Sequence, residues 1–434
     1  MVETISQLFL NTVRTYAKPD LLLSKVRGRY EPLSSEEVET SVRRLTLGLV
    51  SLGCKTGDKV VLLAENGPWW IMADFANLCL GAATVPIYPT LVSEQIKYII
   101  RDSEAMVVMC SSPELWAKIA AVRGDLTKVR HFIVFYDEAP PGTLALNDVL
   151  ARGRAEDERD PGLFERRALA VKSGDLASLI YTSGTTGLPK GVMLSHGNFV
   201  SNIKTLADLV AFGHPDVVLS FLPLSHVLER MVTWAFLYKG CAIAYAESVE
   251  TVAANLIEVR PHIMVSVPRL FEKLYAKIMD NVLLGPPLKR NIFAWAVRVG
   301  TEHSRFALAK KTIPGGLRRR RTLAHKLVFS KILKKTGGRV RFFVSGGAPL
   351  GRDIAEFFHA IGLVVLEGYG LTETSPVLAV NTFEDTRFGT VGKVVPGVQI
   401  AFAPDGEILA KGPNVMSGYY NNEAETRDVF DAEG

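Results

Sequence analysis

The sequence predicts an α/β protein in which two helix-covered, mostly parallel β-sheets pack together and a small distorted β-barrel follows. Three observations predict this fold. A chain of 434 residues, of which 48% are hydrophobic and 22% charged, is globular and too long for one simple core. From about residue 36, helical and strand patterns alternate, as in parallel sheets covered by helices. Beyond Phe388, short β-like runs are separated by glycine and proline.

The first part of the chain supplies one set of alternating elements. Apolar residues at helical spacing predict helices, and short apolar runs predict strands. The expected elements are helix 36–52, strand 59–64, helix 68–80, strand 83–87, helix 96–100, strand 105–110 and strand 131–136. Residues 137–172 are polar and charged, so we expect a surface excursion there.

The alternation resumes after residue 195. The expected elements are helix 196–212, strands 217–222 and 241–245, helix 249–259, strand 262–267, a helix that begins at Pro268, strand 340–344, helix 351–361 and strand 363–366. Proline suits the first turn of a helix, where no hydrogen bond from its nitrogen is needed. We therefore expect α/β subdomains at 1–175 and 176–385 and a β-barrel subdomain at 386–434.

A segment rich in glycine and hydroxyl groups follows the apolar run 176–180, which is predicted to be a buried strand. Its sequence is Tyr181-Thr182-Ser183-Gly184-Thr185-Thr186-Gly187-Leu188-Pro189-Lys190-Gly191-Val192. Glycines let backbone amides approach an anion, hydroxyls add donors, and a lysine supplies positive charge, so the segment is typical of a phosphate-binding loop. It is not a Walker A loop, because Lys190 is followed by Gly191. A turn that merely connects two elements is the alternative.

At these residues the chain resembles the adenylate-forming enzymes, which include acyl-CoA synthetases and luciferases. Further motifs in the expected order support the resemblance: Leu222-Pro223-Leu224-Ser225-His226, Ser345-Gly346-Gly347-Ala348-Pro349-Leu350 and Glu367-Gly368-Tyr369-Gly370-Leu371-Thr372-Glu373. Residues 225–231 and 341–347 are most similar to the long-chain fatty acyl-CoA synthetases. The resemblance runs from about residue 35 to the end of the chain.

The resemblance implies a two-step reaction. A fatty acid carboxylate attacks the α-phosphorus of ATP and expels pyrophosphate, and the thiol of coenzyme A then displaces AMP. The nucleophile is already an anion, so cations, amide donors and alignment matter more than acid or base catalysis. ATP, Mg²⁺, coenzyme A and a long-chain fatty acid are the implied ligands. A family member that passes the acyl group to an acyl-carrier protein, and a catalytically silent binding module, are the alternatives.

The resemblance also assigns roles to individual residues. It implies that Lys190, His226, Thr372 and Glu373 are catalytic, with His226 orienting the substrate carboxylate, and that Thr182 and Glu373 hold Mg²⁺. The implied nucleotide-binding set is Thr182, Ser183, Gly184, Thr185, Thr186, Gly187, Lys190, Gly346, Gly347, Ala348, Glu367, Gly368, Tyr369, Gly370 and Thr372. Tyr369 is expected to stack on adenine, although it could also be a core residue. Glu229 and Arg230 could form an internal ion pair near the site.

A long acyl chain needs an apolar channel beside these motifs. The candidates for its lining are Val227, Met231, Trp234, Phe236, Val267 and Phe271. Core residues have the same composition, so the acyl chain length cannot be read from them.

The resemblance concerns the large N-terminal domain of these enzymes. Family members continue into a Thr-Gly-Asp motif, a hinge and a mobile C-terminal lid, whereas this sequence ends at Gly434. We therefore expect the lid to be absent and the chain to bind nucleotide but turn over little.

Positive charge is concentrated between Lys289 and Arg341, where sixteen basic residues stand against one acid, Glu302. Apolar residues interleave with them, as in helices that lie on an anionic membrane surface or near the phosphates of coenzyme A. A solvated helical face is the alternative, and no motif for nucleic acid accompanies the charge.

The sequence also carries signals of location. It shows no export signal and no apolar run long enough to cross a bilayer. The cysteines at 54, 79, 110 and 241 have no metal-binding spacing, so we expect buried thiols in a cytoplasmic protein, either free in the cytoplasm or associated with a membrane surface.

Overall fold

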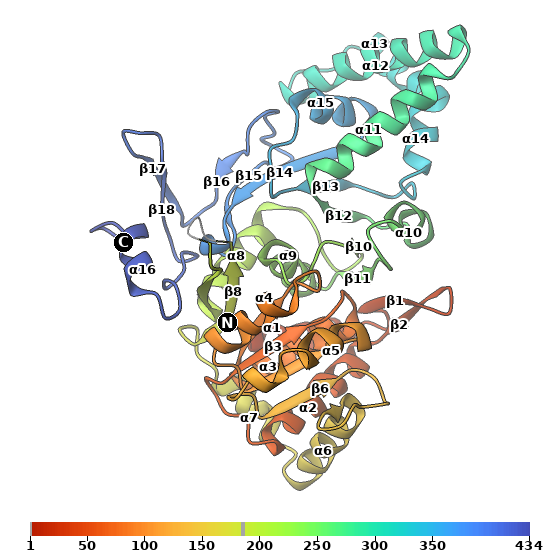
Figure 1. Ribbon diagram of the computed structural model, residues 1–434. Coiled ribbons are helices and arrows are strands. Elements are labelled where there is room, and N and C mark those ends of the chain that lie inside the picture. The colour runs from red at the N-terminus through yellow and green to blue at the C-terminus, as the bar shows by residue number, and fades with distance from the viewer. Residues whose placement is uncertain (1, 184–186) are drawn as a thin grey trace.

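A computed structural model describes residues 2–183 and 187–434 and contains two large sheets, both flanked by helices (Figure 1). The seven-stranded sheet has the order β7-β6-β5-β3-β4-β8-β9 and is parallel except for the β8–β9 pair. Its strands are β3 (Lys59–Leu63), β4 (Ala83–Ile87), β5 (Val107–Cys110), β6 (His131–Val134), β7 (Leu144–Ala145), β8 (Leu176–Thr182) and β9 (Lys190–Ser195).

The nine-stranded sheet has the order β16-β15-β14-β13-β12-β10-β11-β1-β2. Its six central strands are parallel, and β2, β15 and β16 add antiparallel strands at the two edges. The strands are β1 (Leu22–Val26), β2 (Arg29–Leu33), β10 (Val217–Ser220), β11 (Ala242–Tyr245), β12 (Ile263–Ser266), β13 (Phe342–Ser345), β14 (Val364–Gly370), β15 (Val377–Val380) and β16 (Lys393–Val394). The expected pair of helix-covered, mostly parallel sheets is therefore confirmed.

The two sheets do not divide the chain at residue 175. Strands β8 and β9 complete the seven-stranded sheet, while β1 and β2 cross over to the nine-stranded one. The expected boundary between 1–175 and 176–385 therefore does not separate the sheets, because β1 finds its partner in β11 more than two hundred residues away.

Helices cover the faces of both sheets. Those before residue 183 are α1 (Ile5–Tyr16), α2 (Ser35–Ser51), α3 (Pro68–Leu80), α4 (Ser93–Asp102), α5 (Pro113–Ala120), η1 (Arg123–Asp125), α6 (Leu146–Arg159) and α7 (Leu163–Ala170). Those after it are α8 (His196–Leu209), α9 (Val227–Tyr238), α10 (Val252–Val259), α11 (Pro268–Leu283), α12 (Pro287–Leu308), α13 (Gly315–Ala324), η2 (His325–Phe329), α14 (Ser330–Lys334), α15 (Arg352–Ile361), η3 (Thr372–Thr374) and α16 (Glu423–Val429). In the described part of the chain, no helix has the length and apolarity of a bilayer-spanning segment.

Residues 137–172 are not a simple surface excursion, because α6 and α7 form there and α6 packs along α2. Two glycines allow this close crossing. A Cβ on Gly153 would lie 1.7 Å from the carbonyl oxygen of Arg44, and one on Gly48 would lie 2.2 Å from that of Val149. The polar composition of α6 hides the helix in the sequence, since only a narrow face of it is buried.

The C-terminal region differs from the expected barrel. Strands β17 (Gln399–Phe402) and β18 (Ile408–Lys411) form a two-stranded antiparallel sheet of their own, and β16 joins the nine-stranded sheet. The β17–β18 hairpin projects from the molecule, and Phe402 on it is 72% exposed (Figure 1). The described residues close no barrel here.

A buried ion pair connects the two halves of the molecule. The Arg230 guanidinium on α9 donates to both carboxylate oxygens of Asp74 on α3 and, at 2.6 Å, to the hydroxyl oxygen of Ser178 on β8. Both charged side chains are fully buried, and the guanidinium carbon lies 4.6 Å from the centre of the Trp234 ring. The pair fixes α9, which belongs to the large sheet, against the helix and strand of the smaller sheet.

Breaking this pair should destabilise the fold strongly. Arg230→Met leaves the Asp74 carboxylate buried without a partner, which we expect to lower the free energy of unfolding by about 3–5 kcal/mol. Adding Asp74→Leu should restore most of that loss, because no buried charge remains. Urea denaturation of both variants tests this. Arg352→Ala, which breaks an exposed pair with Glu356, is the control and should cost less than about 1 kcal/mol. A loss in Arg230→Met no larger than in the control would contradict the role of the pair.

Candidate active site

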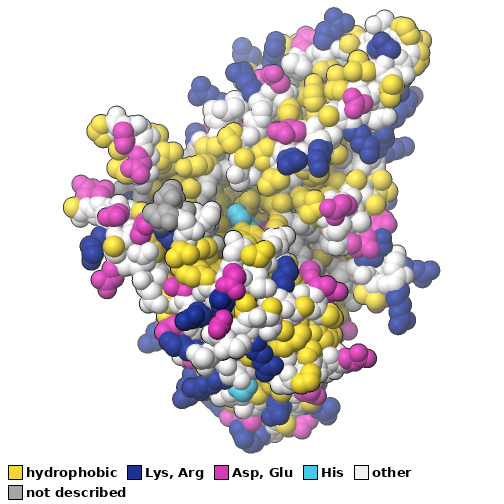
Figure 2. All heavy atoms as spheres, viewed as in Figure 1, with side chains coloured by type: hydrophobic (Ala, Val, Ile, Leu, Met, Phe, Trp, Pro, Cys, Tyr) yellow, Lys and Arg dark blue, Asp and Glu magenta, His cyan; other side chains and the backbone are white. Residues whose placement is uncertain are grey.

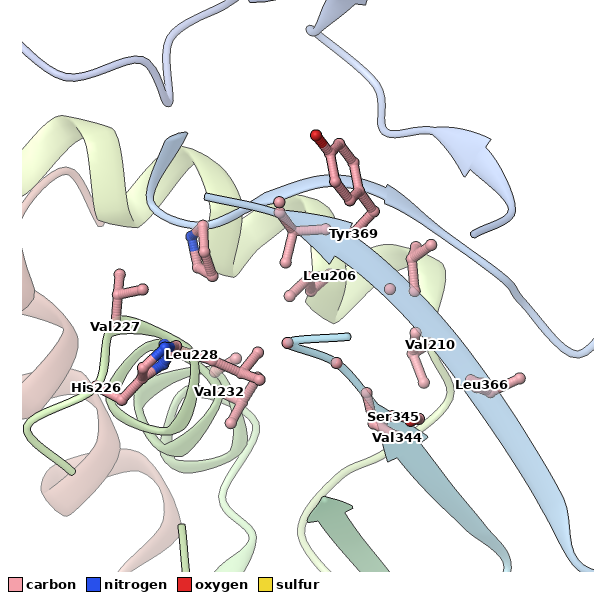
Figure 3. Close-up of a pocket in the computed structure, with 18 of the residues that line it drawn as sticks. Leu206, Val210, His226, Val227, Leu228, Val232, Val344, Ser345, Leu366 and Tyr369 are labelled. Carbon is pink, nitrogen blue, oxygen red and sulfur yellow. The ribbon is translucent and has the colours of Figure 1, made fainter. Parts of the chain in front are cut away.

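A pocket opens between α8, α9 and strands β13 to β15 (Figure 3). At its mouth lie seven of the residues singled out in the sequence: His226, Gly346, Gly347, Gly368, Tyr369, Gly370 and Thr372. Apart from Ser345, the remainder of its wall is apolar and runs down between α8 and α9 on one side and β13 and β14 on the other. The parallel strand β13 ends at this mouth, at the sheet edge where α/β folds bind ligands.

His226 is the N-cap of α9 and stands exposed at the mouth of the pocket. Its Nδ1 accepts the backbone N–H of Leu228 at 3.1 Å, so the neutral ring carries its proton on Nε2. Protein atoms crowd the ring and remove part of its hydration, which lowers the pKa of His226. A neutral ring with one free N–H donor suits the binding of a carboxylate oxygen better than proton abstraction.

Thr372 and Glu373 lie in the short helix η3, which directly follows β14. Hydrogen bonds from residues 414–416, near the C-terminus, hold this turn in place. The N–H of Met416 donates to the backbone oxygen of Glu373 at 2.8 Å, and the side chain of Asn414 donates to the backbone oxygen of Thr374 at the same distance. The backbone of this turn, which carries Thr372 at the pocket and Glu373 beside it, is thus held by residues some forty positions further along the chain.

Tyr419 brings Glu373 and Lys190 into one cluster. Its hydroxyl donates to Glu373 Oε1 at 2.9 Å, and the Lys190 ammonium lies 5.3 Å from the centre of its ring. Burial, and then the neighbouring Glu373 carboxylate, raise the pKa of Tyr419, so its hydroxyl stays protonated and donates. Lys190 also pairs with Glu425 of α16. The lysine and the glutamate that the sequence analysis separated by almost two hundred residues therefore contact the same tyrosine.

The expected phosphate loop connects two antiparallel strands. Thr182, at the end of β8, pairs directly with Lys190, at the start of β9, and both are half-buried. Ser183 and Gly187 are exposed, and Gly187 has a φ of +103° that favours glycine. The remaining loop residues, Gly184, Thr185 and Thr186, lie outside the described residues.

Two of the nucleotide-motif residues stand apart from the pocket wall. Ala348 is exposed beyond the loop after β13, and Glu367 is buried at the base of that loop, where it accepts the Leu350 N–H at 3.3 Å. Burial raises the pKa of Glu367. The hydrogen bond from Leu350 indicates that Glu367 stabilises the loop after β13. Gly370 is required by the fold, because a Cβ there would lie 1.6 Å from the Pro376 oxygen.

The apolar wall differs in part from the expected channel. Val227 and Phe236 line the pocket, whereas Met231 and Trp234 point into the core between the sheets, and Phe271 belongs to a second core on the other face of the large sheet. Val267 lies near Gly347 but outside the described lining. The helical periodicity of α9 explains the difference, because the face that carries Met231 and Trp234 is turned toward the core.

Glu229 and Arg230 do not pair with each other, contrary to expectation. Arg230 binds Asp74, while Glu229 accepts the Ser220 hydroxyl at 2.5 Å and its other carboxylate oxygen has no hydrogen-bond partner among the described residues. Burial raises the pKa of Glu229 to about 8, so this carboxyl is mostly protonated near neutrality. Adjacent positions on a helix point in different directions, which separates the two side chains.

Several supporting residues escaped the sequence analysis. Tyr419, Glu425, Asn414 and Asp74 act through contacts with residues distant in the chain, and none belongs to a motif or to a periodic pattern that would single it out. The pair Tyr419 and Tyr420, directly after Gly418, is the single local hint of a packed turn.

The Glu373 carboxylate is the candidate protein ligand for a Mg²⁺ ion at this site. Over residues 2–183 and 187–434, no group of three or more His, Cys, Asp and Glu side chains is arranged to hold a metal. Mg²⁺ commonly binds one or two carboxylates together with substrate phosphates, so the Glu373 carboxylate, next in sequence to the pocket-lining Thr372, fits such an ion.

Comparison with known proteins places this geometry in a family. The family model of the AMP-binding enzymes matches residues 13–420. The chain belongs to the AMP-binding enzyme family. It is 36% identical over 421 residues to the long-chain-fatty-acid–CoA ligase FadD15 of Mycobacterium bovis, and the match covers 95% of this chain and 68% of that protein. It is 31% identical to the peroxisomal long chain acyl-CoA synthetase 7 of Arabidopsis thaliana, covering 100% of this chain and 64% of that protein.

Solved structures of the family share the fold. The inhibitor-bound N-terminal domain of FACL13 from Mycobacterium tuberculosis has a TM-score of 0.74 and 19% identity, with 99% of this chain and 94% of that one covered. The long-chain-fatty-acid–CoA ligase FadD1 from Archaeoglobus fulgidus has a TM-score of 0.73 and 20% identity, with 100% and 80% covered. The overall fold of this chain is therefore that of these solved enzymes, and its size is that of an N-terminal domain.

The protonated Glu229 predicts a pH-dependent stability. The folded state keeps the proton up to about pH 8, while the unfolded state releases it near its ordinary pKa of about 4.5. Between these values the folded state binds more protons, so stability falls as pH rises, by on the order of 4 kcal/mol. Glu229→Gln mimics the protonated form. Its stability relative to wild type, from urea denaturation, should rise steadily from about pH 5 to pH 8; a difference that does not change with pH would contradict this prediction.

Proposed function

We propose that this chain forms the nucleotide- and acyl-binding part of an ATP-dependent ligase that activates a long-chain fatty acid as an acyl adenylate and transfers it to coenzyme A. The observation that carries the proposal is the joint lining of one pocket. His226, Thr372, Tyr369 and the glycines after β13 stand at its mouth, and an apolar wall leads away from them. A carboxylate bound at the mouth would have its hydrocarbon tail in the apolar part.

The roles of the charged groups follow from their positions. In this proposal Thr372 and the backbone amide of Gly347 donate to the α-phosphate, and Tyr369 offers a ring face to adenine. The N–H of Gly346 is already used, because it donates to the backbone oxygen of Ser266 at 3.1 Å. The loop from Thr182 to Lys190 supplies donors and a cation for the β- and γ-phosphates. Lys190 must exchange its Glu425 partner for phosphate oxygens to serve in this way.

His226 and Glu373 complete the proposed machinery. The free Nε2–H of His226 would donate to one carboxylate oxygen of the fatty acid and so orient the other toward phosphorus. Glu373, with Thr182, would hold Mg²⁺, which neutralises developing charge on the phosphates when bound. The names of the relatives support the choice of a long-chain fatty acid and of coenzyme A as the acceptor.

We also infer that the helical end formed by α11 to α14 lies against an anionic membrane surface. Leu284 and Leu288, at the connection from α11 to α12, are 88% and 71% exposed. They adjoin an apolar groove whose lining includes Lys289, Lys331 and Lys335. Figure 2 shows hydrophobic and basic side chains side by side over this end. Exposed leucines with a lysine rim suit a lipid surface better than a purely solvated face does.

Cytoplasmic location is the simplest setting for this activity. The four cysteines are free and buried, and burial raises the pKa of Cys54, Cys110 and Cys241 to about 12, which keeps these thiols unreactive. Buried reduced thiols support a reducing compartment.

Acyl adenylate formation tests the proposed reaction directly. Incubation of the chain with ATP, Mg²⁺ and palmitate should yield palmitoyl adenylate, detected by mass spectrometry. Lys190→Ala and Glu373→Gln should slow its formation by about 10²-fold or more. The first removes the cation proposed to face the departing pyrophosphate, and the second removes the carboxylate charge proposed to hold Mg²⁺. Glu407→Gln, an exposed carboxylate on the β17–β18 hairpin, is the matched control and should behave as wild type. The proposal fails if wild type forms no adenylate with any fatty acid of a length series.

Vesicle binding tests the membrane surface. The chain should co-sediment with vesicles that contain phosphatidylglycerol, and less so with pure phosphatidylcholine or at high salt, because the lysine rim is attracted to anionic headgroups. Leu284→Asp should reduce binding, whereas Phe402→Asp, at an exposed apolar site on the β17–β18 hairpin, should not. Equal sedimentation of wild type and Leu284→Asp would remove the membrane assignment.

A further inference from the structure

The pocket has a polar mouth and an apolar closed end. Strand β13 runs from Phe342 at the closed end to Ser345 at the mouth, and α9 runs the other way, from His226 at the mouth to Phe236. The ten residue-to-residue steps from His226 to Phe236 rise about 15 Å along the helix axis. An extended acyl chain advances about 1.3 Å per carbon for C–C bonds of about 1.5 Å, so roughly twelve carbons fit between mouth and end.

Phe212 is the residue that separates this closed end from solvent. Six other residues line the end and are buried: Val210, Ala235, Phe236, Phe342, Leu366 and Val380. Phe212 lines it as well and, unlike these six residues, is partly exposed. Its ring packs edge-on against Phe236, with the ring centres 4.9 Å apart and an angle of 71°. Among the residues at this end of the pocket, Phe212 is therefore the candidate for a barrier between the pocket and the surface.

The backbone around Phe212 is fixed, so the ring is the part that can move. Arg341, directly before β13, donates to both carboxylate oxygens of Asp216 at 2.9 Å and also to the backbone oxygen of Ala211. Asp216 in turn accepts the N–H of Gly213 at 3.0 Å. These bonds hold the connection from α8 to β10 on both sides of Phe212. Rotation of the side chain alone would join the pocket to solvent.

We propose that Phe212 is the residue that sets the acyl chain length of this site. Acyl chains of up to about twelve carbons fit with its ring in place, and longer chains displace the ring toward solvent and pass beyond it. This inference rests on the proposed fatty acid function. It adds the residue that determines which acyl chain lengths the site binds. In the wild-type protein, a longer acyl chain must break the contact between the Phe212 and Phe236 rings, and this lowers its binding affinity.

Binding of acyl adenylate analogues tests the role of Phe212 without requiring turnover. The probes are N-acylsulfamoyl adenosines from octanoyl to stearoyl, and the dissociation constants come from isothermal titration calorimetry. In wild type, affinity should rise about four-fold per methylene while the tail fills the pocket, and then rise less once the tail meets Phe212. In Phe212→Ala the rise should continue, so that the stearoyl-to-decanoyl affinity ratio increases about ten-fold or more over wild type.

Two further variants make the result specific. Phe383→Ala removes a similar half-buried ring, which packs on Phe342 at 5.1 Å but does not line the pocket, and should leave the profile unchanged. Ala235→Leu narrows the closed end and should move the change of slope to shorter tails. If wild type binds none of the probes, the fatty acid function fails and this inference with it. If wild type binds them but Phe212→Ala keeps the wild-type profile, only the role of Phe212 is overturned.

Discussion

The fully buried pair of Arg230 and Asp74 is the constraint on which the rest of the structure depends. It fixes α9 of the large sheet against α3 and β8 of the small one, although 156 residues separate the two partners. Helix α9 begins at His226, at the mouth of the pocket, and its other end forms part of the closed end of the pocket. A charge pair that does not line the pocket thus sets the distance and orientation between the proposed carboxylate site and the proposed acyl site.

The nucleotide side of the site is assembled from three separate parts of the chain. The β8–β9 hairpin carries Lys190, the turn after β14 carries Thr372 and Glu373, and the segment around Tyr419 contacts both. Tyr419 donates to Glu373 and lies beneath the ammonium group of Lys190. Without a bound triphosphate the opposite charges of the cluster are satisfied locally, since Lys190 pairs with Glu425. Nucleotide binding would replace the Glu425 carboxylate with phosphate oxygens as the partner of Lys190. The ammonium group would therefore have an anionic partner both before and after binding.

The sequence predicted the elements with strong local patterns and missed those that depend on distant partners. The bounds of α3 and β4 agree with their expected ranges, because Pro68 and Gly81 delimit the helix and an apolar run marks the strand. Motif residues at the ends of β13 and β14 likewise reach one pocket. Helix α6 went unrecognised because it buries a narrow face, and the partner of Arg230 was misjudged because Glu229 is its neighbour in sequence but not in space. The division between sheets failed for the same reason, since β1 pairs with β11.

The central claim is that nucleotide and acyl chain share the pocket between α9 and strands β13 and β14. A crystal structure with a bound N-decanoylsulfamoyl adenosine measures this most directly. The account predicts adenine beside Tyr369, the sulfamoyl group near Thr372, and the decanoyl tail running between α8, α9 and β13 toward Phe212. A tail that leaves the mouth toward solvent, or an adenosine bound away from Thr372 and Glu373, would contradict it.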